Sequence, residues 1–203
     1  TITLNRPDRM NAISRPMLDE LAERLVQCNH DQTVRVVLIT GAGRGFCAGL
    51  DLQDATSGTG IGSSQSKKAA YRLFDLRNAP PTVLHNMDKP TICAINGGAA
   101  GYGMDLALGC DIRLMAEEAK MSAAFTKRGV VPESGGTWLL PRIVGWSVAA
   151  EIFFTGRKLD AKQCLDYGIV NEILPKEDLL DTARGIAAEI AANAPLSHHC
   201  IKT

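Results

Sequence analysis

The residues best suited to chemistry lie where a short apolar run, 91–95, meets a turn with three glycines in six residues, 96–101. The β-formers before this turn predict a buried strand, and the apolar residues after it predict a buried helix. The first turn of a helix has unpaired N–H groups and partial positive charge, so it could hold an anion or a developing oxyanion. Glycine turns of this kind also serve packing alone in many α/β folds, so both interpretations stand.

A second glycine-rich segment, 40–45, follows a β-branched run and suggests a dinucleotide-binding turn. The fit is poor, because Phe46 stands where GxGxxG requires its third glycine. None of the three tyrosines is followed by a lysine at Tyr-x-x-x-Lys spacing either. A nicotinamide-dependent oxidoreductase is therefore the weaker alternative.

The elements that must position these turns alternate between strands and helices, which indicates an α/β fold. Ser14 and Pro16 predict the start of an amphipathic helix, and residues 56–66 predict a surface linker or a mobile loop near the site. Strands are expected at 2–4, 34–39, 91–95, 112–115, 121–125 and 169–174, and helices at 16–26, 67–87 with a break near Pro80, 102–108, 137–144, 148–154, 161–167 and 177–192.

Composition narrows the class of protein. The chain has 22 basic and 22 acidic residues and no basic cluster, so nothing in its charge favours a nucleic acid or a membrane as partner. No apolar run is long enough to cross a bilayer. The six cysteines are scattered without metal-ligand spacing, so we expect free thiols, no metal site and a cytoplasmic location.

Several segments match one family in the same order: NRP at 5–7, FCAGLDL at 46–52, AING at 94–97, LPRIVG at 140–145 and YGIVN at 167–171. Together they resemble the crotonase superfamily of enoyl-CoA hydratases and isomerases, over essentially the whole chain. The resemblance implies one crotonase-like core domain over residues 1–203, a spiral of ββα units with helices after the core. It also implies a homotrimer or hexamer, and a further C-terminal helical segment that this sequence lacks.

The family's shared device is a pair of backbone N–H groups that hold a thioester carbonyl. By resemblance, the donors here are the N–H groups of Leu50 and Tyr102. An enolate carries its charge on oxygen, and losing one fixed donor to such a charge costs roughly 3–4 kcal/mol. The resemblance further implies a coenzyme A thioester as substrate and no permanently bound cofactor. The residues expected to contact this substrate are Arg9, Ala12, Ala48, Asp51, Leu52 and Gly101. The alternative for Arg9 is a solvated surface charge.

Carboxylates decide which reaction follows. Family hydratases hold one water between two glutamates, which align here with Asp105 and Phe125, and phenylalanine cannot transfer protons. Glu133 lies where some family isomerases carry their single base, and an apolar pocket raises the pKa of a carboxyl group and suits it to proton transfer. Either acid could instead only stabilise the start of a helix.

The sequence therefore predicts an enoyl-CoA hydratase or isomerase in fatty-acid β-oxidation-type metabolism. As an isomerase, Glu133 would move a proton from C2 to C4 of a 3-enoyl-CoA. As a hydratase, Asp105 and Glu133 would position water for addition to C3 of a 2-enoyl-CoA. A non-catalytic CoA-thioester-binding protein or an RNA-binding relative is the alternative from another class, and the balanced charge disfavours RNA. Acyl chain length and the choice between the two reactions do not follow from the sequence.

Overall fold

The computed structural model describes residues 1–51, 79–132 and 134–202. Three sequence-based expectations lie outside the described residues: the roles of Leu52 and Glu133 and the loop at 56–66. The same holds for most of the helical region expected at 67–87.

The larger sheet has five parallel strands in the order β1 (Ile2–Leu4), β2 (Val37–Gly41), β4 (Thr91–Ile95), β6 (Ile112–Ala116) and β9 (Glu172–Leu174). Its central strands are buried, as expected for β-branched runs that are covered on both faces. Pairing of β2 begins only at Val37, whose N–H donates to Pro90 O at 3.0 Å. Pro90 has no N–H that could donate a hydrogen bond to the residues before Val37, so β2 starts later than the predicted residue 34.

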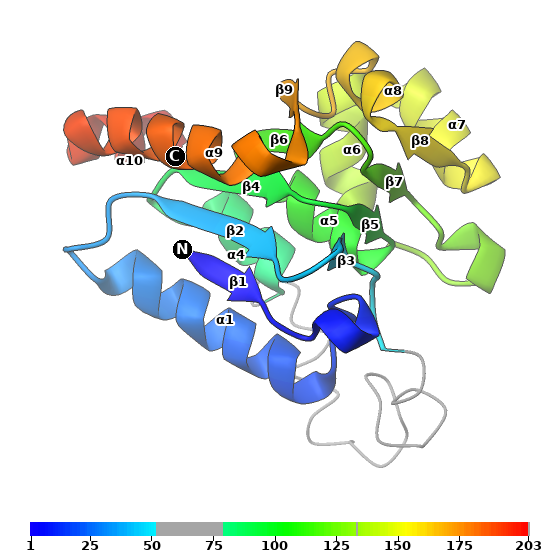
Figure 1. The fold of residues 1–203 in the computed structure, drawn as a ribbon, viewed down its shortest axis with the longest axis horizontal. Coiled ribbons are helices and arrows are strands. Elements are labelled where there is room, and N and C mark those ends of the chain that lie inside the picture. Colours follow the sequence, from blue (N-terminus) through cyan, green and yellow to red (C-terminus); the bar gives the residue numbers. More distant parts are fainter. Residues whose placement is uncertain (52–78, 133, 203) are drawn as a thin grey trace.

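The smaller sheet has four strands in the order β3 (Gly45–Cys47), β5 (Gly98–Ala100), β7 (Lys120–Ser122) and β8 (Lys158–Asp160). The first three are parallel, and β8 is antiparallel to β7. A strand of the larger sheet leads into a strand of the smaller sheet three times, as β2–β3, β4–β5 and β6–β7 (Figure 1). This repeated step is the predicted spiral, and the predicted α/β class is confirmed.

Helices cover and connect the two sheets. The described helices are η1 (Pro7–Arg9), α1 (Arg15–His30), α4 (Pro80–Asn86), α5 (Tyr102–Leu108), η3 (Thr126–Arg128), α6 (Gly136–Val144), α7 (Trp146–Thr155), α8 (Ala161–Asp166), α9 (Lys176–Ala192) and α10 (Pro195–Lys202). Figure 1 shows α9 along one side of the larger sheet and α1 along the other. None of the described helices is both long and apolar enough to span a membrane.

Local signals explain several helix boundaries. The Ser14 side chain accepts a hydrogen bond from Met17 N at 3.4 Å, which is the predicted N-cap of α1. Asp160 and Gln163 form a capping box at the start of α8. The strand predicted at 121–125 ends at Ser122, because Phe125 N donates to Ala123 O at 2.8 Å and the chain turns into η3.

Candidate active site

The backbone at Gly49 lies against the start of α5. A Cβ added to Gly49 would be 2.9 Å from Ala100 O and 3.7 Å from Tyr102 N. The φ angle of Gly49 is +100°, a value that side chains rarely allow. The structure therefore brings together the two segments that the sequence analysis singled out, although they are some fifty residues apart in the chain.

Leu50 is oriented by a single parallel bridge to Ile13. Ile13 N donates to Gly49 O at 2.8 Å, and Asp51 N donates to Ile13 O at 2.9 Å. Because these bonds use the groups on either side of Leu50, its own N–H points away from Ile13. This leaves the Leu50 N–H directed to the other side of the strand, as a carbonyl-binding donor requires.

Tyr102 is the first residue of α5, so its N–H precedes the first hydrogen bonds within the helix. Gly101 O accepts from Met104 N at 2.9 Å and from Asp105 N at 3.1 Å, whereas Tyr102 N belongs to the helix end that has no partner within the helix. Gly103 lets this first turn lie directly on β3, because a Cβ there would overlap Cys47 O. The first turn of α5 is thus fixed against the strand that leads to Leu50 (Figure 1).

Two asparagines hold the glycine turn at 41–45. Asn11 Nδ2 donates to Ala42 O at 2.9 Å and to Gly45 O at 2.8 Å. Asn96 Nδ2 donates to Gly43 O at 3.1 Å, and its Oδ1 accepts from Gly41 N at 3.0 Å. These side-chain contacts give the turn a structural role. These contacts were not predicted from the sequence, although Asn96 lies in the AING segment that carries the family resemblance.

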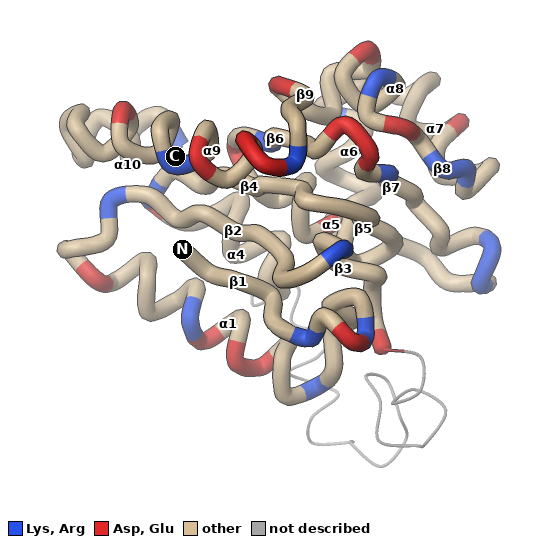
Figure 2. Tube along the Cα trace, in the orientation of Figure 1, with Lys and Arg blue, Asp and Glu red and all other residues tan. Residues whose placement is uncertain are grey.

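Asp51 is a buried carboxylate that two arginines share. Its Oδ2 lies 3.0 Å from Arg6 Nη2 and its Oδ1 lies 3.3 Å from Arg9 Nη2, with the Asp51 side chain 4% exposed. Arg6 Nη1 also donates to Ala12 O at 2.6 Å. Figure 2 shows basic and acidic positions together where the chain leaves β1. Two guanidinium groups therefore share one carboxylate here, and Asp8 adds a second acidic side chain in η1.

The structure gathers most of the residues expected to contact coenzyme A. Ala48 N donates to Met10 O at 3.0 Å, which joins the strand before Leu50 to the turn that contains Arg9 and Ala12. Arg9 pairs with Asp51 while its side chain is 35% exposed, so both interpretations of Arg9 stand. Gly101 lies at the start of α5 with a φ of +53°.

Asp105 lies in the first turn of α5, and Phe125 lies near the start of that helix. Asp105 is 1% exposed, and its carboxylate touches the backbone of Gly136 at the start of α6. The Phe125 ring is close to Gly101, since a Cβ on that glycine would be 3.9 Å from Phe125 Cε1. The position that aligns with the second hydratase glutamate is thus filled by a buried aromatic ring. Ser134, which follows Glu133 in the chain, is 5% exposed.

Cys47 is the thiol nearest to this site. Its burial raises its pKa to about 12, although a hydrogen bond from the backbone of Gly49 partly opposes that shift. The thiol is therefore neutral at physiological pH and is not an activated nucleophile. All six cysteines are described, and all are free. Among the described residues, no group of three or more His, Cys, Asp or Glu could hold a metal ion.

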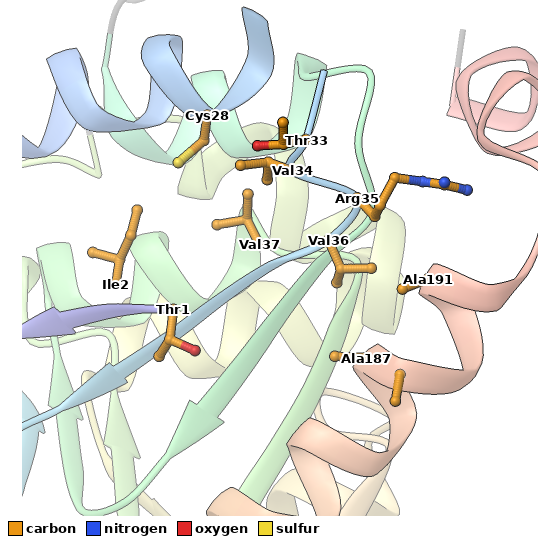
Figure 3. A pocket seen from close by; sticks show the side chains of 11 residues that line it. Thr1, Ile2, Cys28, Thr33, Val34, Arg35, Val36, Val37, Ala187 and Ala191 are labelled. Carbon is orange, nitrogen blue, oxygen red and sulfur yellow. The ribbon is translucent and has the colours of Figure 1, made fainter. Parts of the chain in front are cut away.

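A pocket of about 440 Å³ lies elsewhere, at the amino ends of β1 and β2 (Figure 3). It is lined by the start of β1, the segment before β2 and one face of α9, including Ile2, Val36 and Ala187. The candidate site follows the opposite, carboxyl ends of the parallel strands, where ligands of α/β sheets usually bind. Of the predicted site residues that the structure describes, none lines the pocket.

Comparison with known proteins identifies the family of the chain. The enoyl-CoA hydratase/isomerase family model matches residues 1–203, and the chain belongs to this family. It is 42% identical over 205 residues to 1,2-epoxyphenylacetyl-CoA isomerase of Escherichia coli K12, covering 100% of this chain and 76% of that protein. It is 40% identical over 191 residues to a probable enoyl-CoA hydratase of Mycobacterium tuberculosis, covering 94% of this chain and 67% of the relative.

Solved structures agree with this assignment. An enoyl-CoA hydratase from Bacillus anthracis superposes with a TM-score of 0.88 at 35% identity, covering 98% of this chain and 75% of that one. A monofunctional enoyl-CoA isomerase from M. smegmatis has a TM-score of 0.80 at 36% identity, covering 98% of this chain and 83% of that one. The predicted membership of the crotonase superfamily is confirmed.

Proposed function

We propose that this protein is an enoyl-CoA hydratase/isomerase that acts on acyl-CoA thioesters through an enolate intermediate. One observation carries the proposal: a Cβ added to Gly49 would lie 3.7 Å from Tyr102 N. This closeness of the two segments supports a site shared by the N–H groups of Leu50 and Tyr102. Two fixed donors there would stabilise an enolate oxygen without having to reorient during the reaction.

The proposed chemistry begins with the thioester carbonyl between these two N–H groups. In the isomerase reaction, the carboxylate of Glu133 takes a proton from C2 of a 3-enoyl-CoA. The electron pair left on C2 is delocalised onto the thioester oxygen. Glu133 then returns the proton to C4 while the double bond moves between C2 and C3. The proton transfers need one acid/base group only.

Hydration of a 2-enoyl-CoA is the second candidate reaction. It would need Asp105 and Glu133 to hold and activate one water for addition to C3. Relatives named as hydratases and as isomerases both resemble this chain, so family membership supports either reaction. Phe125, buried beside the helix start, favours the reaction with fewer carboxylates.

The rest of the proposal concerns the ligand and the setting. Coenzyme A enters as part of the substrate, near Arg9, Ala12, Ala48, Asp51 and Gly101, and no permanently bound cofactor is proposed. A role in β-oxidation-type metabolism and a cytoplasmic location stay predictions, which products formed from a chain-length series and fractionation of cells would test.

Binding of an acyl-CoA is the first expected result. Titration of the complete protein with acetoacetyl-CoA in a calorimeter should show saturable binding, because this ligand offers an enolate-like thioester to the two N–H donors. NADH is the control and should not bind, since the 41–45 turn is occupied by Asn11 and Asn96. Absence of acetoacetyl-CoA binding would contradict the proposed function. Binding without turnover of any enoyl-CoA would favour the non-catalytic alternative.

A homotrimer or a hexamer is the assembly that we propose, on the family resemblance. Light scattering coupled to size-exclusion chromatography of the complete protein should therefore report three or six subunits. A stable monomer at micromolar concentration would contradict this part of the proposal.

A further inference from the structure

We infer that Asp105 is a positioning residue, whose carboxylate lies against the first residue of α6 and holds the segment after Glu133 against α5. The inference rests on the proposed function, in which Glu133 transfers the proton. It assigns to Asp105 a role different from the water-activating one of the hydratase reaction, and it leaves one carboxylate for the chemistry.

The contact between Asp105 and Gly136 is the basis of this inference. A Cβ built on Gly136 would overlap Asp105 Oδ1, and it would lie 2.8 Å from Cγ and 3.1 Å from Oδ2. The carboxyl group of Asp105 therefore occupies the space that a side chain at residue 136 would need. Asp105 is 1% exposed and Gly136 is buried, so neither can move aside into solvent.

The partial positive charge at the start of α6 also favours this contact. Within the described residues, α6 has no acidic residue in its first turn and no side-chain hydrogen bond at its N-cap, Gly135. A helix start carries partial positive charge, and a carboxylate close to it is stabilised in its ionised form. Asp105 on α5 is an acidic residue whose carboxyl group lies against this helix start. A carboxylate that accepted a proton in each turnover would lose its favourable interaction with the helix start.

The contact ties the proposed base to the proposed oxyanion donor. Glu133 precedes Gly136 by three residues. Gly135 O accepts from Trp138 N and Leu139 N, each at 2.9 Å, so Gly135 is joined to the first turn of α6. Asp105 follows Tyr102 by three residues on α5. Through Asp105, the start of α6, three residues after the proposed base, thus lies against the helix that carries the proposed second donor.

Two substitutions of Asp105 distinguish positioning from proton transfer. Asp105→Asn keeps the size of the side chain and one oxygen, so kcat of the complete protein on 3-enoyl-CoA should fall by only about threefold to tenfold. Asp105→Glu adds a methylene where Gly136 already touches the carboxylate, so kcat should fall by about a hundredfold, as small misplacements near the chemistry do. A catalytic base predicts the reverse order, with Asn inactive by roughly 10²–10⁴ and Glu active. That reverse order would overturn the inference.

The pH profile of kcat/KM distinguishes a positioning residue from the group that titrates during catalysis. In Asp105→Asn, the acidic limb of kcat/KM should persist, because Glu133 still titrates. Loss of that limb in Asp105→Asn would overturn the inference, since it would identify Asp105 as the titrating base.

A double-mutant cycle tests the contact without any substrate. Gly136→Ala should lower the unfolding temperature of the otherwise unchanged protein, whereas in an Asp105→Ala background it should cost little, because the collision is gone. Gly185→Ala in α9 is the matched control, since a Cβ there meets nothing within 4 Å. An equal cost of Gly136→Ala in both backgrounds would overturn the contact. Coupling in this cycle together with no turnover of any enoyl-CoA would overturn the proposed function instead.

Discussion

Glu133→Gln should bind acetoacetyl-CoA with near wild-type affinity while its turnover falls by roughly 10²–10⁴, the usual contribution of a positioned general base. Glutamine has the same size as glutamate and still forms hydrogen bonds, but it cannot take a proton from C2. The measurements are kcat on the preferred enoyl-CoA and calorimetric affinity for acetoacetyl-CoA. Because the two N–H donors are backbone groups, they are unchanged in this variant.

The matched control for Glu133→Gln is Glu118→Gln, in the exposed turn between β6 and β7. It makes the same chemical change away from the site and should leave kcat within about twofold, as surface substitutions usually do. Wild-type turnover in Glu133→Gln would show that the base is assigned wrongly. Asp105 would then be the group to examine, since it is the other carboxylate that the resemblance places beside the thioester.

The parts of the fold that the sequence predicted well are those with strong local patterns. Residues 91–95 form β4 with the predicted bounds, and α9 begins at Lys176, one residue before the prediction. A run of β-formers and a long stretch of helical periodicity specify these elements almost on their own. In contrast, β5 at Gly98–Ala100 lies inside what the sequence indicated to be a turn.

The reason for this difference is that β5 depends on its neighbours. Glycine and alanine have little preference for strands, so the pairing with β3 and β7 makes this segment extended. The three-residue strand β8 is equally short, and its single apolar residue, Leu159, gives no pattern that predicts a strand. These strands are therefore set by tertiary contacts that a single sequence does not display.

The same distinction applies to the site. The resemblance led to Leu50 and Tyr102, and the structure brings their segments together. The contacts of Asn11 with Gly45 and of Arg6 with Asp51 join residues 34 and 45 positions apart, and no spacing rule predicts them. They are consequences of the fold, and they explain why short segments such as NRP belong to the recognisable pattern.

Gly103→Ala should disable the protein more severely than the loss of any single surface interaction. A Cβ at this position would overlap Cys47 O and lie 2.8 Å from Cys47 Cβ, and a backbone oxygen cannot rotate away. The first turn of α5 must then move off β3, which displaces Tyr102 N from the site. Overpacking of this kind typically costs about 1–3 kcal/mol, and a backbone collision should lie at the upper end of that range. Loss of one oxyanion donor costs roughly 10²–10³ in kcat.

Gly98→Ala, on β5, is the control for Gly103→Ala, because a Cβ there meets nothing within 4 Å. Thermal unfolding and kcat on the same enoyl-CoA should be measured for both variants. We expect Gly98→Ala to keep near wild-type values, and Gly103→Ala to lose both stability and turnover. If Gly103→Ala unfolds at the wild-type temperature and retains full turnover, α5 does not lie on β3 as described. The N–H of Tyr102 could then not be the second donor, because its position depends on that contact.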